Sequence, residues 1–306
     1  MTQIFTDAQA ALGFVQSQTT HIETEVYKQR FPSIRYPGLI PVDTSANPWT
    51  KAVDYYSMSS AGEAKFIADR TSDIPVVGTQ MSKDTTSVHM MGIGYDYGLE
   101  EVNQASMLGI NLSGDKATAA REIYERTVDR IAFTGEADKG FNGLLNHPDV
   151  TVTSAATGNW AAATEDQILA DVNALLTGVF TATNEVAMAN VLLLPSTEFQ
   201  RIASRRLGDT GDTILQFLQR ANAYTAETGQ ALTIRGIRGL DTAGAGATKR
   251  MVAYRNSAQV LKMHIPMPHR FLPVQVQGLT FKVPGIFRLG GLDIRLPQEV
   301  RYADGL

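Results

Sequence analysis

The chain contains no cysteine, which excludes disulfides, thiolate nucleophiles and cysteine-ligated metal sites. It also has no run of about 18 to 20 consecutive apolar residues, the length of a membrane-spanning helix. Its first eleven residues lack the charged-then-apolar pattern of a secretion signal. We therefore expect a protein that does not associate with a membrane and stays in the cytoplasm in which it is made.

An excess of charge of one sign is also missing. The 27 basic and 31 acidic residues are interspersed and give a net charge of -4, so there is no basic surface of the kind that nucleic-acid readers need. Sequence-specific binding to DNA or RNA is not expected, although many copies of a weakly acidic chain can enclose nucleic acid without binding it tightly. With 306 residues, 43% of them hydrophobic, the chain is long enough for one large or two moderate domains.

Catalytic and metal-binding signatures are absent too. There is no Gly-x-Ser-x-Gly or His-Glu-x-x-His motif, and the acidic pairs Glu100/Glu101 and Glu122/Asp129 fit solvated helix faces. The histidines are scattered without metal-ligand spacing: His21, His89, His147, His264 and His269. We predict no catalytic residue, no cofactor-binding residue and no metal ligand.

Two other patterns are candidate binding sites. The glycine-rich loop Ala243 to Lys249 precedes a strand and lacks the spacing of a phosphate-binding loop, which favours a flexible surface loop. Basic clusters fit either exposed arginines or the lining of a symmetric pore or inner wall, and both interpretations stay open: Arg201, Arg205 and Arg206, and Arg235 and Arg238.

The first 48 residues do not form a compact pattern. After a short helical pattern at 7–18, prolines at positions 32, 37, 41 and 48 favour extended or turn backbone. We predict a long extended arm that lies on something, with a meandering surface loop as the alternative.

Two strand-forming segments follow, Trp49 to Met58 and Thr85 to Ile93, and we expect them to pair. The polar stretch Ser59 to Asp84 between them is far too long for a tight turn, which indicates a ribbon with an elaborate tip. A lone hairpin is barely stable in water, so something outside the subunit should cover it. Met90 and Met91 are expected to pack at its base.

The clearest helix should begin near Ser113 or Asp115 and end near Phe133, with Ala120, Tyr124, Val128 and Ile131 on one stripe. A mixed α/β region is expected near 160–255. Its signals are a capping box at Thr164 and Gln167, a strand at 190–195, a short helix capped by Ser196, a helix at 213–223, and strands at 231–234 and 250–254. From Gln259 on the pattern is all strand, and these strands should close back on the region before Gly140.

The turn after the long helix has the pattern Gly135-x-x-Asp138-x-Gly140-Phe141-x-Gly143-Leu144-Leu145-Asn146. Together with the order of parts, it resembles the major capsid proteins of tailed bacteriophages, the Hong Kong ninety-seven-like fold that encapsulins share. The resemblance implies an α+β fold with an N-terminal arm at 1–48 and an extension-loop β-ribbon at 49–94. It also implies a long spine helix within a discontinuous peripheral domain at 95–158 and 256–306, and an inserted α/β axial domain at 159–255.

The function implied by this resemblance is that of a structural subunit, not an enzyme. Hexamers and pentamers of such subunits form an icosahedral virion capsid that encloses double-stranded DNA without sequence-specific binding. The expected partners are copies of the chain, a portal, and a separate scaffolding or decoration protein; assembly would take place in the bacterial host cytoplasm. Lys65 is the only candidate for a cross-link between subunits, and we do not predict that bond. The alternatives are an encapsulin-type shell around a cargo enzyme and a soluble α/β enzyme with an unrecognised site.

Overall fold

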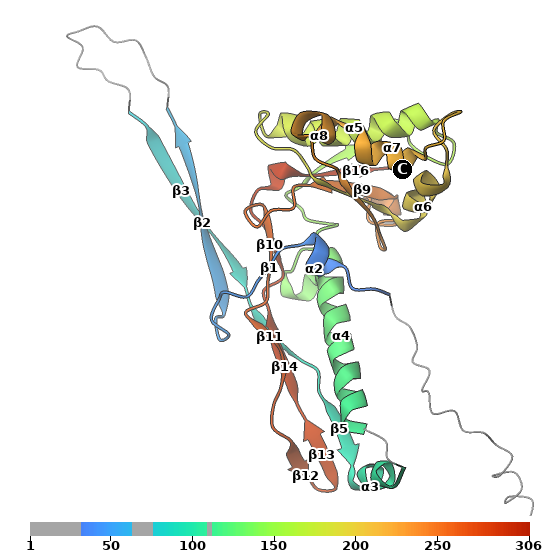
Figure 1. Ribbon diagram of the computed structural model, residues 1–306. Helices are drawn as coiled ribbons and strands as arrows, with labels where there is room; N and C mark the ends of the chain where they lie inside the picture. Colours follow the sequence, from blue (N-terminus) through green and yellow to red (C-terminus); the bar gives the residue numbers. More distant parts are fainter. Residues whose placement is uncertain (1–31, 63–75, 109–111) are drawn as a thin grey trace, which may run out of the picture. The chain divides into compact units, whose positions relative to one another are not determined.

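The computed structural model describes residues 32–62, 76–108 and 112–306, which combine helices and strands in the expected α+β fold (Figure 1). All of the elements below belong to one unit of the chain, Ile34–Leu306.

The largest sheet has five strands. Their order is β6 (Thr151–Ser154), β16 (Val300–Asp304), β9 (Arg250–Tyr254), β7 (Val191–Pro195) and β8 (Thr233–Ile237). The outer pairs β6/β16 and β7/β8 are parallel, and β9 runs antiparallel to both of its neighbours. Strands β6 and β16 come from ranges that the sequence assigned to the peripheral domain. They are nevertheless hydrogen-bonded into the sheet of the α/β region.

Both faces of this sheet are covered at its centre, which explains why β7 and β9 are buried along their whole length, whereas the edge strand β6 is largely exposed. In β7, Leu192 and Leu194 face one core cluster, and Val191 and Leu193 face another. Figure 1 shows α5 (Glu165–Ala182), α7 (Ile214–Arg220) and α8 (Ala223–Thr228) over the first of these faces. The second face packs on the end of the long helix and on the arm.

Two helices in this region begin at capping boxes. Thr164 Oγ1 accepts from the Gln167 amide (3.4 Å) and Gln167 Oε1 accepts from the Thr164 amide (2.8 Å), so the predicted capping box is confirmed. A second capping box at Thr213 opens α7. The predicted cap by Ser196 is wrong: α6 (Ser196–Ser204) includes that residue, and Pro195 precedes the helix without a side-chain cap.

The long helix is α4 (Leu112–Thr134), and its predicted apolar stripe is buried at Ala120, Tyr124, Val128 and Ile131. After it, the glycine turn folds back on the helix end, where the Leu144 amide donates to the Ala132 carbonyl (2.9 Å). The turn leaves no room for a side chain, because a Cβ at residue 143 would lie 2.2 Å from the Phe133 carbonyl oxygen. It thereby buries the leucine pair 144–145 in the core.

The described part of the arm is less extended than predicted. Residues Tyr36–Leu39 form one helical turn, α2, which tolerates Pro37 because the first turn of a helix needs no N–H bond there. Strand β1 (Val42–Asp43) then pairs in parallel with β10 (Leu261–His264), which also pairs with β15 (Leu292–Ile294). The first 31 residues of the predicted arm lie outside the described residues.

The predicted ribbon is a hairpin of β2 (Ala52–Ala61) and β3 (Gly78–Ser87), with Ala52 opposite Ser87 and Ala61 opposite Gly78. The prediction that the tip extends from Ser59 to Asp84 is wrong, since β2 continues to Ala61 and β3 begins at Gly78. Between Gly78 and Asp84 every residue is exposed and only Met81 is apolar, so this stretch lacks the apolar alternation that a half-buried strand shows.

The chain leaves the hairpin after Ser87 and meets its own C-terminal strands. Strand β4 (His89–Gly92) pairs with β14 (Gly285–Leu289), which also pairs with β11 (Met267–Phe271). Strand β5 (Tyr95–Gly98), which leads into helix α3 (Leu99–Leu108), pairs with β13 (Thr280–Val283), and β13 pairs with β12 (Gln275–Gln277). The terminal strands therefore close back on residues that precede the long helix.

Candidate interaction surfaces

The histidines are dispersed in the fold as they are in the sequence. His147 lies 3.8 Å from Asp149, and His264 lies 3.5 Å from Asp293. His269 is buried, stacks on Tyr124 and bonds to the Ile93 carbonyl (3.0 Å). Among the residues that the structure describes, no group of three or more His, Cys, Asp or Glu could hold a metal ion.

Two sets of buried ion pairs hold the fold together. Glu198 is fully buried and pairs with Lys249 (2.5 Å) and Arg201 (2.7 Å). Asp304 binds the Arg250 guanidinium through two hydrogen bonds of 2.6 and 2.9 Å, and the same guanidinium donates to the Leu145 carbonyl (2.8 Å). Burial raises the pKa of Asp304, but the hydrogen bonds from Arg250 and from the loop amide at 245 outweigh it and lower this pKa overall.

The glycine-rich loop is tied to the same carboxylate. The Ala245 amide donates to Asp304 Oδ2 (2.9 Å), and the Gly244 amide donates to the Thr248 carbonyl (2.9 Å). A carboxylate of the chain itself therefore accepts the hydrogen bond of one backbone amide that a phosphate-binding loop would need to be free. The geometry agrees with a structural loop.

Two arginines of the predicted basic clusters form ion pairs with carboxylates of the same subunit. Arg201 pairs with the buried Glu198, and Arg205 pairs with Glu165 (2.7 Å) and donates to the Ala163 carbonyl (2.7 Å). These two arginines support α6 and the start of α5, so they are structural and not simply exposed charges.

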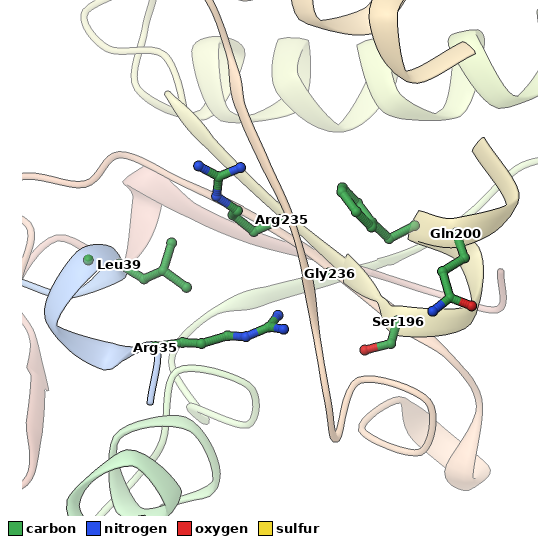
Figure 2. A pocket seen from close by; sticks show the side chains of 8 residues that line it. Arg35, Leu39, Ser196, Gln200, Arg235 and Gly236 are labelled. Atoms are coloured by element: carbon green, nitrogen blue, oxygen red, sulfur yellow. The ribbon is translucent and has the colours of Figure 1, made fainter. Parts of the chain in front are cut away.

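Arg235 lies instead at a cleft of about 540 Å³ beside the start of α6. Figure 2 shows the Arg35 side chain extending from the arm toward Ser196, with Gln200 further along α6. The lining includes no carboxylate, histidine or lysine, and arginine stays protonated in proteins, so the cleft supplies no general acid or base.

The arm is held on the long helix by two acidic residues, of which Asp129 was expected only on a solvated helix face. Asp129 Oδ1 accepts from the Arg35 amide (2.8 Å) and the Tyr36 amide (2.9 Å). The Tyr36 hydroxyl donates to Glu125 (2.9 Å), and burial together with this bond raises the pKa of Tyr36. The partners are 89 to 94 residues apart in the sequence, and this separation hides such contacts from pattern analysis.

The largest uncovered apolar side chains of the β2–β3 hairpin are Tyr56, Met58 and Met81, which are 65%, 68% and 71% exposed. At its base, Met91 packs against the core as predicted, but Met90 is 61% exposed, so the prediction is wrong for that residue. Lys65 lies outside the described residues. The described part of the hairpin therefore presents an exposed apolar surface.

Comparisons with known proteins agree with this interpretation. The capsid of Myoviridae phage XM1 has a TM-score of 0.80 at 21% identity, over 95% of this chain and 98% of that chain. The capsid of a native GTA particle gives 0.66 at 12% identity, over 98% and 99%. A virus-like particle from Pyrococcus furiosus gives 0.56 at 12% identity, over 88% and 91%. At these identities the likeness establishes the fold. No curated protein sequence gives a significant match.

The family assignment comes from the sequence itself. A model of the major capsid protein family matches residues 62–306, well over half of the chain. No helix among the described residues is long and apolar enough to cross a membrane. The chain therefore belongs to the major capsid protein family: it is a structural subunit that assembles with copies of itself into a virion capsid, and not an enzyme.

Proposed function

We propose that this subunit forms hexamers and pentamers of an icosahedral shell that encloses double-stranded DNA. The observation that carries the proposal is the β2–β3 hairpin, whose ten-residue strands pair only with each other within the described chain. An isolated two-stranded hairpin is marginal in water, and burial between subunits would supply the missing stability.

The proposed division of labour follows the predicted domains: the arm at 1–48, the extension loop at 49–94, the peripheral domain at 95–158 and 256–306, and the axial domain at 159–255. Strand pairing adds β6 and β16 to the axial sheet. The two buried clusters on either side of that sheet support a rigid connection between axial and peripheral parts, because β7, β9 and β16 contribute to both.

The enclosed DNA would be confined without sequence-specific contacts, as the net charge of -4 indicates. A portal and a separate scaffolding or decoration protein complete the proposed partners, and assembly would take place in the host cytoplasm. An encapsulin-type shell around a cargo enzyme is the less favoured alternative, since the matching family model is that of major capsid proteins.

Size-exclusion chromatography combined with negative-stain microscopy tests the shell. The chain, expressed with any scaffold from the same genome, should elute in the void volume as closed particles. Nuclease-resistant DNA in particles from infected or induced cells supports the capsid, and a protein cargo supports the alternative. A stable monomer under all of these conditions would refute both.

The hairpin has its own test. Deleting Ser59 to Val77 should leave the subunit folded, because the deleted residues that the structure describes belong to neither core cluster, but should impair particle formation. Normal closed shells from the deleted protein would show that the hairpin is not an assembly element.

A further inference from the structure

The two faces of the β2–β3 hairpin differ in chemistry. Directly paired residues of antiparallel strands point to the same face, and successive residues alternate. The register places Tyr56 opposite Lys83 and Met58 opposite Met81 on one face, which we call the apolar face. Ser57 lies opposite Ser82 on the other, the hydroxyl face, and their hydroxyls are hydrogen-bonded (2.6 Å).

The serine hydroxyls of the hydroxyl face already have hydrogen-bond partners within the hairpin. Its serine pair is bonded across the strands, and nearer the base Tyr55 points to this same side, where the Arg295 guanidinium lies 4.8 Å from its ring centre. This side of the base therefore meets the rest of the subunit. Among the residues that the structure describes, Tyr56 on the opposite side has no comparable contact with an arginine and is 65% exposed.

The apolar face is exposed in the subunit. Its three large side chains, Tyr56, Met58 and Met81, are each about two-thirds exposed or more, at 65%, 68% and 71%. Apolar side chains grouped on one face of a strand pair mark a surface that is buried in the working state. Methionine is flexible and fits irregular or slightly different surfaces, as a contact repeated between many copies requires.

The charges of the apolar face indicate the class of partner. Asp54 and Lys83 lie on this face and neutralise each other in an ion pair of 2.7 Å, with Thr85 also donating to Asp54 (2.7 Å). A face without net charge does not fit the phosphate backbone of nucleic acid, which attracts unpaired lysine and arginine. It fits a neutral protein surface.

A second copy of the chain offers such a surface. In the sheet of β12, β13 and β5, Val276, Phe281 and Tyr97 form one row across the strands. Val276 is 67% exposed and the neighbouring Leu279 is 74% exposed. Ten-residue strands make the hairpin about 30 Å long, and a face about 10 Å wide then buries about 300 Å², less than the roughly 800 Å² per partner of a stable dimer. The contact suits a shell in which many copies act together.

We propose that the apolar face of the hairpin is the face buried against a second copy of the chain, and that the hydroxyl face beyond Tyr55 stays accessible. The proposal rests on the proposed shell function and adds which side of the hairpin carries the contact. Residues 57 and 58 are neighbours in sequence, yet they should differ in burial once the shell forms.

The absence of cysteine from the chain allows a direct measurement, because an introduced thiol is unique. Met58→Cys and Ser57→Cys differ by one position and by face. The rate of maleimide modification should fall at least tenfold on assembly for Met58→Cys and less than twofold for Ser57→Cys. Equal protection at both positions, or stronger protection at 57, would overturn the proposal.

Charge substitution gives an independent readout. Met58→Asp combined with Met81→Asp should reduce the assembled fraction at least tenfold, as measured by sedimentation and negative stain. The matched pair Ser57→Asp with Ser82→Asp should change it less than twofold, and circular dichroism should show both variant subunits folded. Equal loss for both pairs, while the parent chain forms shells, contradicts the face assignment alone. A parent chain that never forms shells contradicts the shell function as well.

Discussion

The five-stranded sheet has strands of four or five residues and the β2–β3 hairpin has strands of ten, and the two also differ in what covers them. The sheet is buried on both faces by the subunit's own helices and arm, whereas the hairpin has Tyr55 directed toward the subunit and Tyr56 directed away from it. Residues of the sheet therefore determine whether the subunit folds. Residues of the apolar face of the hairpin determine how the folded subunit associates with other copies of the chain.

The largest expected effect on folding is at the buried ion pair of β9 and β16. Asp304→Ala should lower the free energy of unfolding by about 3 to 5 kcal/mol, because it leaves the buried Arg250 guanidinium without its counter-charge. Urea denaturation of the unassembled subunit measures this loss.

The matched control replaces both partners, Arg250→Met with Asp304→Leu, and should recover most of the stability because no charge is left buried alone. If the double variant were as unstable as Asp304→Ala, the pair would matter for its hydrogen bonds to Ala245 and Leu145 and not for charge compensation.

A smaller effect is expected in the turn after α4. Gly143→Ala should destabilise the subunit by about 3 kcal/mol, because the new Cβ meets backbone atoms of Phe133 and Gly135 at 2.2 and 2.5 Å that cannot move without opening the turn. Gly140→Ala is the control: its φ of +71° is strained for alanine, but its Cβ meets nothing within 4 Å, so it should cost about 1 to 2 kcal/mol. Thermal melting of the two variants separates close packing from backbone strain; equal losses would rule out the packing explanation.

This contrast between covered and uncovered regions also explains which features the sequence reveals. The apolar stripe of α4, the strand at 191–195 and the capping box at Thr164 were predictable, because burial and capping leave a periodic or local signature. Strand β3 was placed too late, since an exposed strand such as Gly78–Asp84 needs no apolar alternation. The pairing of β16 with β6 and β9 joins distant segments, which no local pattern encodes.

The interaction surface was predictable in outline and not in detail. The sequence indicated a ribbon that something must cover, and the match to the major capsid family supports that role. The face that is left uncovered depends on the register, since a shift by one residue would exchange Met58 for Ser57 on a given side. This register, with Ala52 opposite Ser87, is given by the structure and not by the sequence pattern.

A pH-dependent effect of about 1 kcal/mol is expected where the arm meets β10. Hydrogen bonds from the Ser45 hydroxyl (2.6 Å) and amide (2.9 Å), and then Lys262, lower the pKa of Asp43 to about 2. An unfolded aspartate titrates near 3.9, so this carboxylate stabilises the fold above about pH 4 and the contribution is lost as the pH falls through about 2. Partial exposure of Asp43 limits its size.

Ser45→Ala removes the largest cause of that shift. Its unfolding free energy should be about 1 kcal/mol below that of the parent at pH 6. The difference should shrink as the pH falls through about 2 and disappear below it, where Asp43 is protonated in both proteins. Urea titrations at several pH values measure the difference directly. A gap that stays constant with pH would assign the effect to loop packing and not to the carboxylate.

The smallest effect concerns the attachment of the hairpin base to the subunit. Tyr55→Leu removes the contact with the Arg295 guanidinium, worth about 0.5 to 1 kcal/mol, and should speed hydrogen exchange of the hairpin-base amides about two- to fivefold in the unassembled subunit. Tyr56→Leu, one residue on and 65% exposed, should leave these amides unchanged. Equal acceleration in both variants would mean that the subunit supports neither face of the hairpin, and that the side it turns outward is decided only when a neighbouring copy arrives.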